Sequence, residues 1–398
     1  MKILIASDLH WPTLNGVATF SRNLAQGLAA RGHEVLVIAP SQTGKKYEEI
    51  DGDYLIKRTQ AITFPFYQKF RISVTPQLEV RSIIDNFKPD VVHIQMLMWI
   101  GQATMSYARK KHIPVVSTSH AMPENLMDNI TSIEAITTPI NYALRDFGRR
   151  FHSKADCITT PTESAIRMFG KHSEKISKPI EVVSNGIDLK RFKPGEAPKA
   201  LYKRYDIPQD KLIVSYIGRL DTEKHLFVLL KAFALVKAVY DAHLVIVGSG
   251  TELENLISLS HELDITSSVS FTGRVSDKDL EYLHRIGQMY CIPSPAELQS
   301  IATLEAMASG QPIVAVDAGA LSELCHDGEN GYLFPLDDFE AMAKGIDKIL
   351  SDTTLREKFS QESLAIAATH DLDHTLEQFE AIYRRVIKSK ADELAQLD

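Results

Sequence analysis

Short apolar runs alternate with amphipathic segments along most of this chain. Four runs rich in aliphatic and β-branched residues are predicted strands: residues 2–7, 34–40, 89–95 and 114–120. Between the first two, residues 17–32 place apolar side chains at helical spacing and end in a glycine, which predicts a helix. Strands that alternate with helices are typical of an α/β fold with a parallel, doubly wound sheet.

The alternation stops near residue 185 and then starts again. Residues 185–210 are rich in Lys, Arg, Pro and Gly and are predicted to form a linker. Strand-like runs follow at 211–219, 243–250, 268–274, 288–294, 312–316 and 331–334, with helical segments between them. We therefore expect two Rossmann-like domains, residues 1–190 and 191–374, whose ligands bind beyond the carboxyl ends of the strands, in a cleft between the two sheets. The amphipathic segment 375–398 is expected to be a helix that packs back on the first domain.

Composition narrows the class of protein. The 398 residues include three widely spaced cysteines, Cys157, Cys291 and Cys325, which are predicted to be reduced thiols in the core of a cytoplasmic protein. No run of about 18 apolar residues occurs, and the N-terminus lacks the pattern of a signal peptide. We therefore expect no membrane-spanning helix.

The net charge of −7 conceals an asymmetry between the two halves. Residues 1–200 contain 26 Lys and Arg against 19 Asp and Glu, whereas residues 201–398 contain 18 against 32. The basic half suits an anionic partner, such as a membrane surface or a phosphorylated substrate. The acidic second half and the lack of a known nucleic-acid-binding module argue against nucleic acid.

Three loops that follow predicted strands carry candidate chemistry. Gly16 ends the first loop and would let the backbone approach a ligand at a helix N-terminus, although any such turn needs a glycine. Arg219 and Lys224 follow the apolar strand 211–217, and two cations at this spacing suit a diphosphate. Two solvated surface cations remain the alternative.

The strongest motif is a pair of glutamates separated by seven residues. Glu297 falls in a predicted turn after a strand, and Glu305 lies inside the following apolar helix. Backbone N–H groups near Leu298, Gln299 and Ser300 would face an anion or a sugar at this helix start. A carboxylate among apolar residues needs a partner, and hydroxyl groups of a sugar or ribose would serve.

These motifs together resemble family 4 of the glycosyltransferases, which are retaining enzymes with the GT-B fold, over nearly the whole chain. The Glu-x7-Glu pair, the segment 218–224, the Gly16 loop and the linker motif at 184–192 carry the resemblance. It implies that Gly16, Arg219, Lys224 and Arg274 bind the donor, with the backbone of residues 298–300, that Glu297 holds sugar hydroxyls and that Glu305 holds the ribose. His120 matches the family's active-site histidine. No metal or other cofactor is implied, because Arg219 and Lys224 can neutralise the diphosphate.

The sequence departs from the family's pattern at three places. Asn15 stands where many members have a first glycine, and His225 stands where a glycine usually follows the lysine. Residues 298–300 replace a commoner aromatic–Gly pair. These departures bear on the identity of the donor sugar more than on the reaction class.

A narrower resemblance points to members that glycosylate diacylglycerol and related lipids. Aromatic and basic side chains interleave in residues 63–76 and 145–154, and a mixture of this kind suits an anionic bilayer surface. The candidate acceptor and membrane residues are Phe64, Phe66, Tyr67, Lys69, Arg71, Trp99, Arg145, Arg149 and Arg150. The alternative is that these residues belong to the core and to a solvated basic face.

The resemblance therefore predicts a cytoplasmic enzyme, peripheral on the inner face of the membrane, that transfers glucose from UDP-glucose to a lipid such as 1,2-diacylglycerol. Other hypotheses remain open: a GDP-mannose-dependent or other hexosyltransferase with another lipid or soluble acceptor, a nucleotide-sugar epimerase, and a binding protein without activity. The intact set of Arg219, Lys224, Glu297 and Glu305 argues against the last of these.

Overall fold

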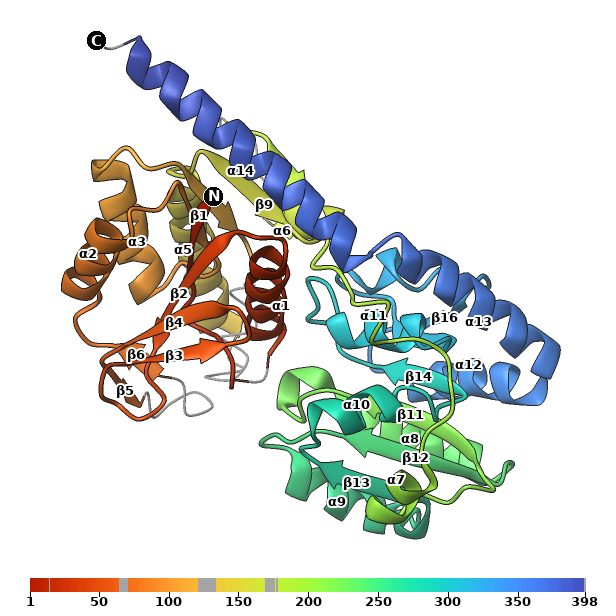
Figure 1. The fold of residues 1–398 in the computed structure, drawn as a ribbon. Helices are drawn as coiled ribbons and strands as arrows, with labels where there is room; N and C mark the ends of the chain where they lie inside the picture. The colour runs from red at the N-terminus through yellow and green to blue at the C-terminus, as the bar shows by residue number, and fades with distance from the viewer. Residues whose placement is uncertain (14, 64–70, 121–133, 169–175, 177, 397–398) are drawn as a thin grey trace. The chain divides into compact units, whose positions relative to one another are not determined.

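The structure, a computed structural model, describes residues 1–13, 15–63, 71–120, 134–168, 176 and 178–396. The chain forms two compact units. Unit 1 contains Met1–Asn185 and Asp373–Asp398, and unit 2 contains Gly186–Leu372. Figure 1 shows the elements of both units.

Unit 1 is built on an eight-stranded sheet with the order β10-β9-β8-β7-β1-β2-β4-β3. The strands are β1 (Lys2–Ala6), β2 (Glu34–Pro40), β3 (Tyr47–Asp51), β4 (Tyr54–Thr59), β7 (Val91–Ile94), β8 (Val115–Thr118), β9 (Cys157–Thr160) and β10 (Ile180–Val182). The helices are α1 (Gly16–Ala30), α2 (Pro76–Phe87), α3 (Trp99–Lys110), α5 (Glu134–His152), α6 (Glu163–Met168) and α14 (Leu372–Ala395). A separate hairpin pairs β5 (Ala61–Thr63) with β6 (Arg71–Ser73).

One edge of this sheet differs from the expected all-parallel arrangement. β3 runs antiparallel to β4, and Gly52, with φ +63°, lies in the tight turn between them. A left-handed residue is what a two-residue hairpin turn requires. The polar run at 47–51 alternates between half-buried and exposed positions, as an edge strand does.

Unit 2 has a six-stranded, fully parallel sheet with the order β13-β12-β11-β14-β15-β16. The strands are β11 (Leu212–Ile217), β12 (Ala242–Val247), β13 (Val269–Gly273), β14 (Met289–Ile292), β15 (Ile313–Val316) and β16 (Gly331–Phe334). The helices are α7 (Lys199–Arg204), α8 (Leu226–Lys237), α9 (Leu253–Glu262), α10 (Asp277–Leu283), α11 (Ile301–Ala308), α12 (Phe339–Ser351) and α13 (Thr353–Ala368). The fold is thus two Rossmann-like α/β domains, as expected.

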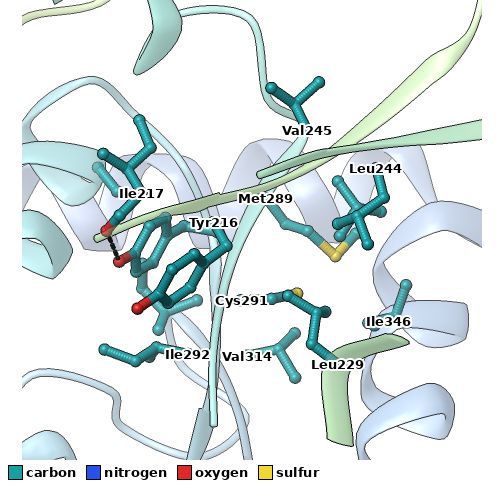
Figure 2. Packing of buried hydrophobic residues seen from close by; sticks show 14 of the residues in the cluster. Tyr216, Ile217, Leu229, Leu244, Val245, Met289, Cys291, Ile292, Val314 and Ile346 are labelled. Carbon is teal, nitrogen blue, oxygen red and sulfur yellow. Dashed lines mark hydrogen bonds between the residues drawn. The ribbon is translucent and has the colours of Figure 1, made fainter. Parts of the chain in front are cut away.

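The core of unit 2 is continuous from strand to helix. Figure 2 shows Tyr216, Met289 and Cys291 of the sheet beside Leu229 and Ile346, which come from α8 and α12. The three cysteines are free and buried, and burial raises the pKa of each thiol.

The segment predicted to be a linker is packed in unit 2 rather than solvated. It contains the short helix α7, and its apolar side chains Ile187, Phe192, Leu201 and Ile207 are buried in the unit 2 core. The linker was predicted because the segment is rich in charged residues and Pro. One buried apolar side chain every few residues is nevertheless enough to pack the segment against the domain.

Each sheet reverses its strand order at one place. In unit 1 the chain builds β2 and β4 on one side of β1 and then β7 on the other, so the switch point lies between β1 and β7. In unit 2 it lies between β11 and β14 for the same reason. Ligands of doubly wound sheets bind beyond the carboxyl ends of the strands at such points.

Helix α14 belongs to unit 1. The ring of Phe379 lies 5.8 Å from that of Phe20 on α1 and 5.0 Å from that of His93 on β7. Glu380, whose side chain is 9% exposed, accepts hydrogen bonds from Arg31 Nε at 3.0 Å and from His33 Nε2 at 2.9 Å. These bonds lower the pKa of Glu380 from 4.5 to about 2.

We predict that Glu380→Gln lowers the free energy of unfolding by about 2 kcal/mol at pH 7, the scale of hydrogen bonds to a charged group. Because the folded-state pKa is depressed, this contribution is complete above about pH 4.5 and is lost as the pH falls to about 2. Urea unfolding at several pH values measures it.

The matched control is Glu377→Gln on the same helix. Glu377 is 61% exposed and pairs with Arg31 at 3.8 Å, so its loss should cost less than about 1 kcal/mol. Equal losses in the two variants would contradict the assignment of Glu380 as the main anchor of α14.

Candidate active site

The turn after β11 lies at the switch point of unit 2 and depends on close backbone packing. The Tyr216 hydroxyl donates to the carbonyl oxygen of Arg219 at 2.8 Å, and a Cβ at Gly218 would lie 2.6 Å from that hydroxyl. The backbone at Gly248 approaches even more closely, since a Cβ there would lie 1.8 Å from the carbonyl oxygen of Gly218. Only glycine fits at these two positions, and the turn that carries Arg219 is therefore rigidly placed.

Arg219 is not an isolated cation. Its guanidinium donates to the carboxylates of Asp221 and Glu223, which are both buried. Asp221 also accepts a hydrogen bond from the backbone N–H of Thr251 at 3.0 Å. The two acids orient the planar guanidinium and offset its charge. The sequence analysis predicted the cation but not these two partners. The alternation of acid and base in residues 219–224 was the available signal.

Lys224 and Glu297 form an ion pair across the switch point. Lys224 Nζ lies 2.7 Å from Glu297 Oε1 and 3.4 Å from Ser294 Oγ, and the two charged side chains are 12% and 15% exposed. Lys224 comes from the turn after β11, and Glu297 from the turn after β14. The structure thus brings together two residues that the sequence analysis treated as separate contacts for phosphate and sugar.

The residue after Lys224 explains the family's preference for glycine there. His225 has φ +49°, a left-handed conformation that glycine adopts freely and that most other residues adopt only rarely. Its Nδ1 lies 2.7 Å from Asp337 Oδ1, and this contact offsets part of the cost.

Glu305 has a protein partner that the sequence did not reveal. Its side chain is buried on α11, and Oε2 lies 3.1 Å from Nε2 of the fully buried His284. Gln311 donates to the carbonyl oxygen of His284, and Ser215 on β11 donates to Gln311 Oε1 at 2.8 Å. The expected need for a partner is therefore met in part by His284. A lone histidine at the end of a helix gave no sequence signal.

The remaining donor candidates of unit 2 lie at the ends of strands. Ser300 is the N-cap of α11 and accepts a hydrogen bond from the Thr303 N–H, while Leu298 and Gln299 precede it in the turn. Arg274 is exposed directly after β13. Their contacts with a donor stay predictions.

In unit 1, the loop after β1 ends at the N-terminus of α1. Asn15 is the N-cap, and its side chain accepts from the Ala18 N–H at 2.8 Å. A Cβ at Gly16 would meet nothing within 4 Å, so the space beside it is open. The N-cap role accounts for Asn15 at a position where a glycine is common, because Asn caps helices better than Gly does.

A buried aspartate and a half-buried histidine, both titratable, flank the switch point of unit 1. Asp8, after β1, accepts hydrogen bonds from the N–H groups of Ile100 at 2.9 Å and Gly101 at 3.3 Å, and so caps α3. Burial raises its pKa to about 7, although these bonds oppose the shift. His120, after β8, bonds through Nε2 to Gln95 Oε1 at 2.7 Å. Burial lowers the pKa of His120 to about 3, so the imidazole is neutral at physiological pH.

The candidate membrane residues are only partly described. Phe64, Phe66, Tyr67 and Lys69 lie outside the described residues, and Arg71 begins β6. Trp99 begins α3 and is partly exposed. On α5, Arg145 is half-buried, while Arg149 and Arg150 both pair with Asp146 at 2.7 Å. Of the helices in the described part of the chain, none has the length and apolar character needed to cross a bilayer.

Comparison with known proteins identifies the family. Residues 14–191 match the family described as Glycosyltransferase Family 4, and residues 199–364 match Glycosyl transferases group 1. The chain belongs to family 4 of the glycosyltransferases. The enzyme class and the GT-B fold are therefore confirmed, and the family is a retaining one.

Two curated relatives are named for different activities. The chain is 27% identical to a GDP-mannose-dependent alpha-mannosyltransferase of Corynebacterium glutamicum, over 89% of this chain and 81% of that protein. It is 26% identical to an alpha-monoglucosyldiacylglycerol synthase of Streptococcus pneumoniae, over 84% and 75% of the two chains. The family 4 enzyme described here thus has relatives that are named for different sugars, mannose and glucose.

Solved structures support the fold of this glycosyltransferase. Sucrose-phosphate synthase of Thermosynechococcus elongatus superposes with a TM-score of 0.80, at 20% identity over 98% of this chain and 99% of that one. Anabaena HepE in complex with UDP and glucose gives a TM-score of 0.73, at 19% identity over 96% and 99%. At this level of identity the likeness establishes the architecture only.

We predict that Lys224→Ala or Arg219→Ala lowers the rate of sugar transfer by roughly two to three powers of ten, the scale for one lost charge-stabilising donor. Steady-state kinetics with the active donor measures the loss. Lys237→Ala, which removes a half-buried cation that pairs with Asp241 at the end of α8, is the control and should leave the rate unchanged. Wild-type kinetics in Arg219→Ala would show that the donor phosphates bind elsewhere.

Proposed function

We propose that this retaining glycosyltransferase transfers glucose from UDP-glucose to a membrane lipid such as 1,2-diacylglycerol and forms an α-glycoside. The main support for the proposal is the exposed apolar and basic face of α5 in unit 1. The relatives named alpha-monoglucosyldiacylglycerol synthase, from Streptococcus pneumoniae and Acholeplasma laidlawii, supply the chemistry of the acceptor.

The face of α5 is not part of the core. Ile140, Phe147 and Arg150 follow one another at helical spacing and are all exposed, Phe147 by 46%. A single exposed apolar residue needs no explanation, but aromatic and aliphatic side chains beside arginines suit the headgroup region of an anionic bilayer. This exposure supports a peripheral membrane enzyme over the alternative that these residues are buried.

The donor site of unit 2 suits transfer without a metal ion. The phosphates of the donor would bind Lys224 and Arg219, which stabilise the negative charge that develops on the leaving diphosphate. Glu297 and Ser300 would hold hydroxyl groups of the sugar, and Glu305, fixed by His284, would hold the ribose. Charge neutralisation by two cations replaces the role that a divalent ion has in other phosphate chemistry.

The proposed mechanism retains configuration by reaction on one face of the sugar. The acceptor hydroxyl oxygen bonds to the anomeric carbon as the bond to the diphosphate oxygen breaks, and that phosphate oxygen takes the proton of the hydroxyl. Double displacement would need a carboxylate beneath the anomeric carbon. Glu297, which lies 2.7 Å from Lys224, is the candidate, but the family resemblance implies that it holds sugar hydroxyls away from that face.

The second candidate function is transfer of mannose from GDP-mannose to a lipid or soluble acceptor. Relatives from Corynebacterium glutamicum and Mycobacterium tuberculosis are named GDP-mannose-dependent alpha-mannosyltransferases, and they match 89% and 85% of this chain. The donor base and the donor sugar are the two features that separate the candidates.

The decisive experiment supplies the protein with UDP-glucose or GDP-mannose and with vesicles that contain diacylglycerol. We expect a glucosylated lipid by mass spectrometry, with an α-anomeric signal in its proton NMR spectrum. Transfer from GDP-mannose alone would favour the second candidate. A β-linked product from an α-linked donor would overturn the one-face mechanism.

The same assay tests the independence from metal ions. EDTA should leave the rate unchanged if Arg219 and Lys224 neutralise the diphosphate. Loss of activity in EDTA that magnesium or manganese restores would refute this part of the proposal.

We predict that the protein binds vesicles containing anionic lipid and that salt weakens the binding, because each cation near such a surface contributes about 1 kcal/mol. Arg150→Ala should therefore weaken binding about fivefold in a vesicle co-sedimentation assay. Lys237→Ala in unit 2 is the matched control. Equal binding to neutral vesicles, or binding that salt does not change, would contradict the role of the α5 face.

A further inference from the structure

Gln95 occupies the central position at the carboxyl edge of the unit 1 sheet. It follows β7, which lies between β1 and β8 at the switch point, and its backbone N–H donates to the carbonyl oxygen of Ala6 at the end of β1. Its side chain reaches His120, after β8, with 2.7 Å between Oε1 and the imidazole Nε2. The residue thus joins the two loops that flank the expected substrate site.

The Gln95 amide makes this one side-chain hydrogen bond and no other with the described part of the chain. Gln95 is fully buried, and its amide nitrogen has no hydrogen-bond partner among the residues that the structure describes. A buried donor without an acceptor is unfavourable, and an apolar side chain of similar size would avoid that cost. Proteins tolerate an unfavourable buried polar group mainly at functional sites. The unsatisfied amide of Gln95, next to the histidine that matches the family's active-site residue, fits this pattern.

We propose that Gln95 is a positioning residue, which holds His120 as the neutral tautomer with its proton on Nε2 and leaves Nδ1 to accept a hydrogen bond from a substrate hydroxyl. Oε1 can only accept, so the hydrogen of this bond comes from the imidazole. In a neutral imidazole the other nitrogen is then an acceptor. No described residue bonds to Nδ1 of His120.

The surroundings of His120 favour the same state. The ring packs against Phe20 of α1, with 4.9 Å between the ring centroids. Among the described residues, the titratable groups that interact with it are His93 on β7 and His152 on α5, and His152 opposes protonation of His120. His93 is itself held by the Tyr383 hydroxyl of α14 at 2.7 Å and by Thr118 at 2.6 Å. Desolvation, with a smaller contribution from His152, lowers the pKa of His120 to about 3, so the ring is neutral at physiological pH and one nitrogen can accept a hydrogen bond.

The first test needs no substrate. Protein labelled with ¹⁵N in its histidine rings, with a His120→Asn variant for assignment, shows the tautomer of His120 directly by NMR. We expect the proton on Nε2 in the wild type and a mixture of tautomers in Gln95→Leu. A proton on Nδ1 in the wild type, or the same tautomer in both proteins, would overturn the proposal.

Two further measurements distinguish positioning from a purely structural role. Gln95→Glu places a carboxylate against Nε2, and we expect it to raise the pKa of His120 by about one to three pH units. Gln95→Leu should lower kcat/KM for transfer about tenfold while the thermal midpoint stays the same or rises. Gln26→Leu, at a half-buried glutamine of α1 that bonds to Asp51, is the control and should leave kcat/KM unchanged.

The kinetic part rests on the proposed function, whereas the tautomer does not. If the wild type transfers neither glucose from UDP-glucose nor mannose from GDP-mannose, the proposed function fails and the NMR result still decides the role of Gln95. A full loss of stability in Gln95→Leu would contradict the proposal, because it would show that the residue holds the fold.

Discussion

The ion pair between Lys224 and Glu297 is the interaction on which the donor site depends. It joins the turn after β11 to the turn after β14, so it closes the switch point of unit 2. Two cations, Arg219 and Lys224, stand among three carboxylates there, those of Asp221, Glu223 and Glu297. A diphosphate added to this group would meet excess negative charge unless one carboxylate moved away. Glu297 is the natural one to move, because its proposed partners are hydroxyl groups of the sugar that the diphosphate carries.

The sequence predicted those features that a local pattern encodes. Apolar runs identified the parallel strands, and their spacing with helices identified two Rossmann-like units. The Glu297 and Glu305 spacing, with Arg219 and Lys224, pointed to a family 4 glycosyltransferase before any contact was known. The antiparallel strand β3 was missed because a polar edge strand has no apolar run, and the packed segment 185–210 was missed because its composition resembles that of a linker.

The partners of the site residues could not be predicted in the same way. His284 lies 21 positions before Glu305 in the chain, and Gln95 lies 25 before His120. The packing of helices and strands in each folded unit brings these pairs together, and a single sequence does not reveal that packing. Asp221 and Glu223 are close to Arg219 in the sequence, but an acid near an arginine is common on any protein surface. Only their burial in the structure shows that they are partners of Arg219 at the site.

The site residues at the two switch points are held in the same way. In each unit, a charged or polar group at the site is held by a buried neighbour that fixes its orientation: His284 for Glu305 in unit 2, and Gln95 for His120 in unit 1. Preorganised groups of this kind favour catalysis because little reorganisation is left to the reaction itself. In unit 1, His93 is in turn held by Tyr383 of α14. This helix therefore helps to support the residues packed around His120.

The most direct test of this account is the affinity for UDP, measured by calorimetry in the wild type and in Glu297→Gln. UDP carries the diphosphate but lacks the transferred hexose. Glu297 therefore competes with it for Lys224 and gains no hydroxyl partners from that hexose. We predict that Glu297→Gln binds UDP more tightly than the wild type, whereas Lys224→Ala binds it more weakly. Weaker binding of UDP by Glu297→Gln would contradict the claim that the diphosphate takes the place of Glu297 at Lys224.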